Sequence, residues 1–179
     1  PPVPAGQHDD GVVAAVGDEG DHRDAVAQSE AHEPGAAAEL DLVPHPEGGF
    51  YRETYRSALT LDLPDGRRRA ASTAIHFLLP PGTWSAWHRV ASDEVWHHYD
   101  GGVLRLHLLG LGTRLLHRGD PQATVPAGVW QAAEPVEEAV LCGCTVAPGF
   151  EFADFEIGRA EELAAAFPDE EPLIRRFIR

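Results

Sequence analysis

The chain has 179 residues, a length that suits one hydrophobic core and is short for two. Its 29 acidic and 14 basic residues give a formal net charge of −15, and the phosphates of nucleic acids repel so acidic a surface. We therefore expect no nucleic-acid partner. No apolar run approaches the roughly 20 residues that span a bilayer, so we expect no membrane partner either.

Residues 1–40 differ in composition from the rest of the chain. They contain no aromatic residue, and nine acidic residues stand against one basic residue, Arg23. Such a segment buries too little apolar surface to offset the entropy that ordering would cost. We predict an acidic tail over 1–40, disordered or loosely docked, and a single domain over 41–179.

From residue 42 onward, short apolar or alternating runs are separated by glycine and proline. The runs cover 50–57, 72–79, 94–99, 103–109, 122–125, 139–146 and 151–157. Many short strands broken by turn signals are typical of a β-sandwich or β-barrel. Only 159–167 has a helical pattern, with Glu161 and Glu162 in its first turn and Pro168 just after its end. The sequence therefore predicts an all-β domain with one short C-terminal helix.

Two cysteines, Cys142 and Cys144, are too few for a disulfide framework. On a strand they point to the same face, and we interpret them as small core side chains in a reducing compartment. The first residues show no basic stretch followed by an apolar one, so we expect no signal peptide and a cytoplasmic location.

The most specific pattern runs from Gly82 to Gly101. With His88 and Glu94 between them, these residues have the spacing of the first motif of the cupin superfamily, which the segment resembles. That motif has a second histidine two residues after the first, where this chain has Val90.

Residues 119–131 resemble the second cupin motif, with Gln131 where a histidine is expected. A narrower resemblance is carried by Pro44–Glu53, Ser72–Ile75, Ser92–His97, Val125–Gln131 and Gly143–Phe152. These segments are similar to an uncharacterised cupin family, a domain of unknown function whose members share the barrel of the deoxysugar-nucleotide 3,5-epimerases. The resemblance implies a double-stranded β-helix, the cupin jelly-roll barrel, and a homodimer.

In cupins, inward side chains of the two motifs bind a metal. The resemblance implies His88, Glu94 and Gln131 as ligands of a divalent transition metal, with His98 to complete the set. Because Val90 and Gln131 replace two of the four usual ligands, we instead predict no cofactor. His88 and Glu94 then form a hydrogen-bonded pair at the base of a ligand pocket.

The related epimerases use a barrel histidine as the base that removes a proton next to a carbonyl. The resemblance implies His76 or His88 in this role, with Glu94 orienting the imidazole and Tyr51 or Tyr99 as the acid. For each histidine, the alternative is a purely structural role.

Glu53 and Arg52 belong to a Gly-Phe-Tyr-Arg-Glu segment that resembles the first barrel strand of these epimerases. The arginine that anchors the substrate there is Gly48 here. Arg52, Arg56 or Arg89 would then supply a positive charge to the ligand, and for any one of them an ordinary surface position is the alternative.

Aromatic side chains lie next to the motif positions. Trp96 and Trp130 flank Glu94 and Gln131, and we interpret them, together with His98, as walls of a small-molecule pocket. The alternative for the tryptophans is the barrel core.

Three functions remain open from the sequence. The first is an isomerase- or epimerase-type enzyme that acts, without metal, on a carbonyl-containing sugar or natural-product intermediate. The second is a metal-dependent cupin enzyme, such as a dioxygenase, decarboxylase or polyketide cyclase. The third is a non-catalytic metabolite sensor.

Overall fold

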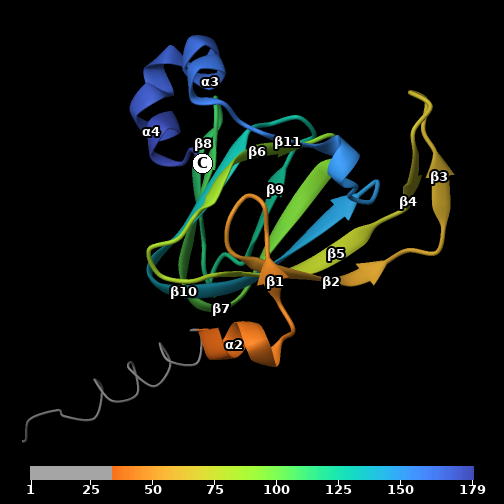
Figure 1. Cartoon of the computed structure of the whole chain (residues 1–179), viewed down its shortest axis with the longest axis horizontal. Coiled ribbons are helices and arrows are strands. Elements are labelled where there is room, and N and C mark those ends of the chain that lie inside the picture. The colour runs from red at the N-terminus through yellow and green to blue at the C-terminus, as the bar shows by residue number, and fades with distance from the viewer. Residues whose placement is uncertain (1–33) are drawn as a thin grey trace, which may run out of the picture.

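The computed structural model describes residues 34–179 (Figure 1). Most of the predicted tail, residues 1–33, therefore lies outside the described residues. The last residues of that tail form helix α2 (Pro34–Glu39), in which Ala37 is buried against Leu42 and Leu78. The boundary at residue 40 stays a prediction.

The described chain forms a curled sheet of nine strands and a separate two-stranded hairpin. The strands are β1 (Val43–Pro44), β2 (Phe50–Arg56), β3 (Thr60–Asp62), β4 (Arg68–Ala70), β5 (Thr73–Leu79), β6 (Ser85–Val90), β7 (Asp93–Leu108), β8 (Gly112–Leu116), β9 (Gln122–Val125), β10 (Gln131–Ala147) and β11 (Phe155–Ile157). The order in the large sheet is β1-β2-β5-β10-β6-β11, and β7 pairs with β10, β8 and β9. All of these pairs are antiparallel, which confirms the predicted all-β architecture.

Two long, bent strands hold the barrel together. β7 and β10 pair along most of their length, with register shifts beside the bend. The sequence predicted separate strands on either side of Asp100–Gly102, and this was wrong. Gly101 has φ 93°, and a Cβ there would lie 2.0 Å from the carbonyl oxygen of Ala139, so glycine lets the strand bend without ending it.

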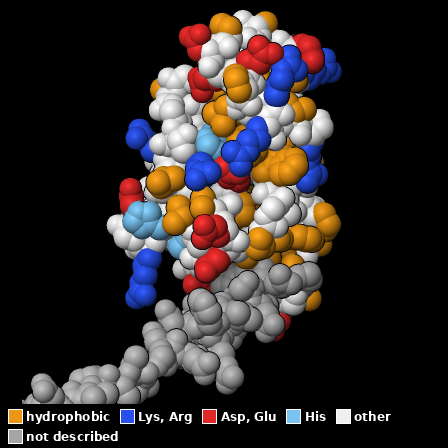
Figure 2. Space-filling view, turned by 90° about the vertical axis from the view of Figure 1, so that its left-hand side faces the viewer, with side chains coloured by type: hydrophobic (Ala, Val, Ile, Leu, Met, Phe, Trp, Pro, Cys, Tyr) orange, Lys and Arg blue, Asp and Glu red, His pale blue; other side chains and the backbone are white. Residues whose placement is uncertain are grey.

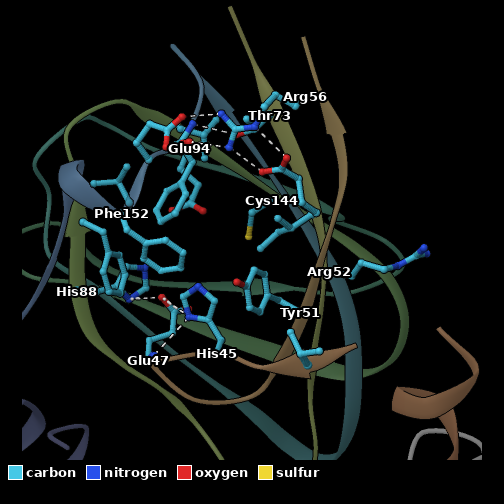
Figure 3. Close-up of a pocket in the computed structure, with 18 of the residues that line it drawn as sticks. His45, Glu47, Tyr51, Arg52, Arg56, Thr73, His88, Glu94, Cys144 and Phe152 are labelled. Atoms are coloured by element: carbon cyan, nitrogen blue, oxygen red, sulfur yellow. Dashed lines mark hydrogen bonds and ion pairs between the residues drawn. The ribbon is translucent and has the colours of Figure 1, made fainter. Parts of the chain in front are cut away.

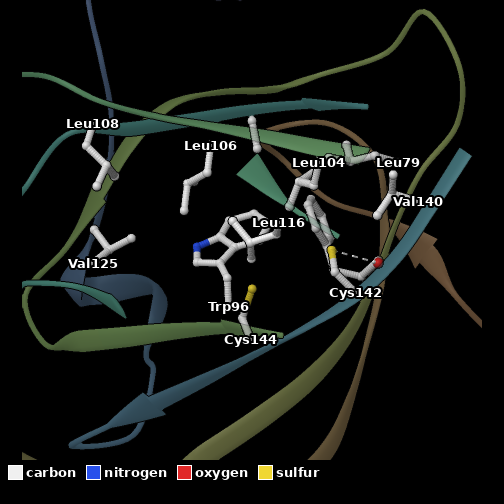
Figure 4. Close-up of a cluster of buried hydrophobic side chains, with 12 residues drawn as sticks. Leu79, Trp96, Leu104, Leu106, Leu108, Leu116, Val125, Val140, Cys142 and Cys144 are labelled. Atoms are coloured by element: carbon white, nitrogen blue, oxygen red, sulfur yellow. Dashed lines mark hydrogen bonds between the residues drawn. The ribbon is translucent and has the colours of Figure 1, made fainter. Parts of the chain in front are cut away.

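One part of the barrel interior is packed with apolar side chains (Figure 4). Twelve buried residues form this cluster: Phe77, Leu79, Trp96, Leu104, Leu106, Leu108, Leu116, Val125, Ala133, Val140, Cys142 and Cys144. Both cysteines are buried free thiols, as predicted from their alternation.

The C-terminal segment covers one end of the barrel (Figure 1). Helix α3 (Ala160–Ala166) confirms the predicted helix, and a 3-10 turn, η2 (Pro168–Glu170), leads to a second helix, α4 (Glu171–Arg176). The sequence analysis missed α4 because six residues are too few to show a helical period. Its Ile174 packs on Trp87, whose indole N–H donates to the Ile174 carbonyl at 3.0 Å.

The β3–β4 hairpin extends away from the body of the barrel (Figure 1). On the face turned to the viewer in Figure 2, acidic, basic and hydrophobic side chains are interspersed. Among the described residues, no helix has the length and apolar character needed to cross a membrane.

Candidate functional site

A cavity of about 260 Å³ lies within the barrel, next to the packed cluster (Figure 3). Its walls are mainly apolar and come from β1, β2, β5, β6, β7, β10, β11 and the segment around the 3-10 turn η1 (Phe152–Asp154). The apolar lining residues are Val43, Tyr51, Ile75, Val90, Val146, Phe150, Phe152 and Phe155. A volume near the lower limit of ligand pockets suits a small molecule.

Two imidazoles and a carboxyl group meet at one end of this cavity. Oε2 of Glu47 lies 3.5 Å from Nδ1 of His45 and 3.3 Å from Nδ1 of His88. His88 projects inward from β6, whereas His45 and Glu47 come from the loop between β1 and β2. The His45 ring also meets the edge of Tyr51, with ring centroids 4.5 Å apart.

A second buried carboxyl group, that of Glu94, enters the cavity from β7. Its Oε2 accepts a hydrogen bond from Nε2 of Gln131, whose Oε1 in turn accepts the indole N–H of Trp96 at 2.8 Å. Because an indole nitrogen can only donate, this contact fixes the orientation of the amide. The thiol of Cys144 lies next to Glu94 in the lining.

Burial favours the uncharged form of all four of these titratable groups. It raises the pKa of Glu47 from 4.5 to about 8 and lowers that of His45 from 6.5 to about 3. Burial also raises the pKa of Glu94, opposed by the neighbouring His88, and lowers the pKa of His88, opposed by Glu94. At the polar end of the cavity, burial therefore favours neutral imidazoles, which accept protons, and protonated carboxyl groups, which donate them.

The predicted ligands do not fit a metal. The carbonyl oxygen of Gln131 is bonded to Trp96, and the amide nitrogen that faces Glu94 is not a ligand. Val90, at the position of the second motif histidine, lines the cavity with an apolar side chain. Within residues 34–179, no group of three or more His, Cys, Asp or Glu side chains could hold a metal ion.

At another part of the lining, Arg56 joins two segments of the wall. It makes two hydrogen bonds with the carboxylate of Glu53, and others with Glu151 at 2.7 Å and the carbonyl oxygen of Phe150 at 3.1 Å. Arg52 also contributes to the wall, but its side chain points away from the cavity (Figure 3). Neither arginine lining the cavity is thus free to bind an anion inside it.

The structure brings together only part of the predicted site. Tyr51, Glu53, His88 and Glu94 line the cavity, and Gln131 reaches it through Glu94. These residues were predicted from three separate segments of the sequence, and the barrel places them around one space.

The remaining predicted residues lie outside this lining. His76 packs against the exposed Tyr99, with ring centroids 5.9 Å apart. Trp96 belongs to the packed cluster, and Nε2 of His98 bonds to a backbone carbonyl at 2.7 Å. Trp130 packs near the C-terminal helices.

Sequence reasoning missed His45 and Glu47. Both lie in the His-Pro-Glu-Gly-Gly segment that contributed to the family resemblance, but they were not singled out. The paired Gly48 and Gly49 were a usable signal, because two adjacent glycines indicate a sharp turn that can bring its polar neighbours close to a barrel.

The model of the family described as Cupin superfamily (DUF985) matches residues 36–158. The chain belongs to this cupin family. A hypothetical protein from Leishmania major is 32% identical to this cupin, with a TM-score of 0.74 over 82% of this chain and 98% of that chain. Protein SO0799 from Shewanella oneidensis is 33% identical, with a TM-score of 0.75 over 83% of this chain and 98% of that chain.

A more distant structure, the cupin-2 domain of Rru_A2000 from Rhodospirillum rubrum, is 15% identical, with a TM-score of 0.56 over 78% of this chain and 90% of that chain. It shows the fold alone. No curated protein matches this cupin significantly. The predicted jelly-roll fold and the cupin family are thus confirmed, whereas the likeness to deoxysugar epimerases stays a prediction.

Proposed function

We propose that this cupin binds a small, uncharged carbonyl compound in its cavity and moves a proton at the carbon next to the carbonyl, without a metal. The observation that carries the proposal is the presence of a buried imidazole, His88, and a buried carboxyl group, Glu94, in the lining of one apolar cavity. An isomerase or epimerase needs such a neutral base and neutral acid.

His88 has the tautomer that a base requires. Its Nδ1 lies 2.9 Å from the carbonyl oxygen of Ala86, which can only accept, so the proton of the neutral ring is on Nδ1. Nε2 then carries the free lone pair. It has no hydrogen-bond partner among the described residues and is available to a ligand in the cavity.

In the proposed reaction, Nε2 of His88 removes the proton from the carbon next to the carbonyl. The protonated carboxyl group of Glu94 transfers its proton to the carbonyl oxygen, so that a neutral enol forms and Glu94 becomes a carboxylate. In an α-hydroxy carbonyl compound, return of the proton from His88 to the former carbonyl carbon gives an isomer, and Glu94 takes back the proton of the neighbouring hydroxyl group. An epimer needs a second donor on the opposite face of the carbon, for which Tyr51 lines the cavity, and His88 then releases its proton to solvent. No oxidant or reductant is needed, because only protons move.

The charge of the lining supports an uncharged substrate. Arg56 is already bound to two carboxylates, and Arg52 points away from the cavity. Glu53 and Glu151 would repel a phosphate near the Arg56 contact. A sugar diphosphate, the substrate type of the epimerases, is therefore a poor fit.

The test is deuterium exchange by the full chain in deuterium oxide. The probes are hydroxyacetone, dihydroxyacetone and phenylacetone, with dihydroxyacetone phosphate as the charged match. We expect exchange next to the carbonyl of at least one uncharged probe, slowed about 100-fold or more in His88→Gln and Glu94→Gln. His97→Gln, on the outer side of the sheet, is the control and should leave the rate unchanged.

Two outcomes would overturn the proposal. One is the absence of exchange with every uncharged probe, including any that binds. The other is a rate that survives His88→Gln but is lost in His76→Gln, which would move the base to the outer face of the sheet. Faster exchange with dihydroxyacetone phosphate than with dihydroxyacetone would contradict the prediction that the substrate is uncharged.

A further inference from the structure

We infer that Glu47 positions His88 for proton transfer, as the middle member of a buried chain of contacts from Ser85 through Glu47 to His88. The inference rests on the proposed function, because it needs His88 to act as the base. It assigns a role to a carboxyl group that the mechanism above does not use.

The contacts of Glu47 link its two oxygens to different neighbours. The Ser85 hydroxyl donates to Oε1 at 2.8 Å, while Oε2 lies 3.3 Å from Nδ1 of His88. The exposed fractions of Ser85, Glu47 and His88 are 0, 5 and 2%. Water therefore does not compete strongly for these contacts, and the carboxyl group stays on the Nδ1 side of the imidazole.

The backbone is shaped to hold Glu47 at this place. The N–H of Ala86, on β6, donates to the carbonyl oxygen of Glu47 at 2.8 Å. The next residue, Gly48, has φ 117°, and a Cβ there would lie 2.1 Å from the carbonyl oxygen of Trp84. Only glycine fits so close to that strand, so the loop brings Glu47 and His88 together through main-chain contacts as well as side chains.

The charge of His88 changes during the proposed reaction, and this gives Glu47 a task. When Nε2 takes a proton, the ring becomes a cation in a cavity with little solvent, which is costly without a nearby negative charge. The carbonyl of Ala86 supplies only a dipole. Ionised Glu47 supplies a full negative charge, and its contact with Nδ1 keeps the ring turned with Nε2 toward the ligand.

This role predicts a pH dependence, since Glu47 has a pKa of about 8 and ionises as the pH approaches that value. Several groups set its ionisation together. The titratable and charged groups that face Glu47 are His45, His88, Glu94, Cys142, Cys144 and Arg179. All of them remain when Glu47 alone is replaced by glutamine.

The experiment measures the pH profile of deuterium exchange with the uncharged probe that exchanges fastest. In the wild-type chain we expect the rate to rise toward a pH of about 8. Glu47→Gln should lower the maximal rate about 10- to 100-fold and abolish this rise. Glu156→Gln removes an exposed carboxylate that pairs with Arg89 and is the control.

A second variant tests the role of Glu47 even if the Glu47→Gln protein does not fold. Ser85→Ala removes a hydrogen bond that lowers the pKa of Glu47, so the rising part of the profile should move to higher pH. Unchanged rates and profiles in both variants would overturn the role of Glu47 while leaving the proposed function intact. Absence of exchange in the wild-type chain would instead overturn the proposed function.

Discussion

The two parts of the barrel interior differ sharply, although the same strands build both. Along β7, Glu94 faces the cavity, whereas Trp96, two residues later, and Leu104 beyond the bend belong to the packed cluster. The packed part contains apolar side chains in close contact (Figure 4), while the cavity contains four titratable groups whose pKa values burial shifts in favour of the uncharged form. The packed part supplies stability, and the cavity carries polar groups that reduce it, as expected of a functional site.

The largest expected effect is in the packed part. Leu104→Ala removes a fully buried side chain and should lower the free energy of unfolding by about 3 kcal/mol, measured by urea denaturation. Leu115→Ala, on the exposed side of β8, is the control and should change it by less than about 0.5 kcal/mol. Similar losses in both variants would show that the two sides of the sheet are not packed as described.

For a change of one pH unit, an intermediate effect on the free energy of unfolding is expected in the cavity. The pKa of Glu47 is 4.5 in an unfolded chain and about 8 in the folded protein. Between these values the folded protein keeps a proton that the unfolded chain has lost, so stability falls as the pH rises. Relative to wild type, Glu47→Gln should gain roughly 1.4 kcal/mol of unfolding free energy per pH unit across this range.

The quantity to measure is the difference in unfolding free energy between wild type and Glu47→Gln, by urea denaturation at several pH values. The neighbouring groups His45, His88, Glu94 and Arg179 are present in both, so their own titration largely cancels. A difference that stays constant with pH would contradict the raised pKa of Glu47.

The smallest effect is expected where Arg56 joins the segments of the cavity wall. It pairs with Glu53 and Glu151, but all three side chains are more than a third exposed. Arg56→Ala should therefore cost less than about 1 kcal/mol of unfolding free energy, and added salt should shrink the loss further. A loss as large as that of Leu104→Ala would show that these contacts support the barrel itself.

The sequence contained much of the fold and the centre of the site. Glycine- and proline-bounded runs predicted the strands, and the spacing of His88 and Glu94 placed both in the barrel. Alternation also explains why the side chain of Arg52 points away from the cavity. Arg52 pairs with His76 on the adjacent strand. The neighbouring Ile75 faces the other side of the sheet and lines the cavity.

The rest depends on contacts between distant parts of the chain. Glu47 lies in a loop, where no alternation fixes side-chain direction, and its position is set by the main chain of Ala86 and Trp84. The orientation of Gln131 is likewise set by Trp96, 35 residues away. Sequence spacing alone can identify such residues as candidates, but it does not predict which of their atoms are in contact.

The most direct test of the account is the effect of metal removal on the exchange reaction. The wild-type chain is treated with a chelator, its metal content is measured by elemental analysis, and exchange is followed with the fastest uncharged probe. Because the proposed reaction uses only side chains of this chain, among them His88 and Glu94, we predict an unchanged rate in the metal-depleted protein. Loss of exchange on chelation, restored by adding back one divalent transition metal per chain, would contradict the account and favour a metal-dependent cupin.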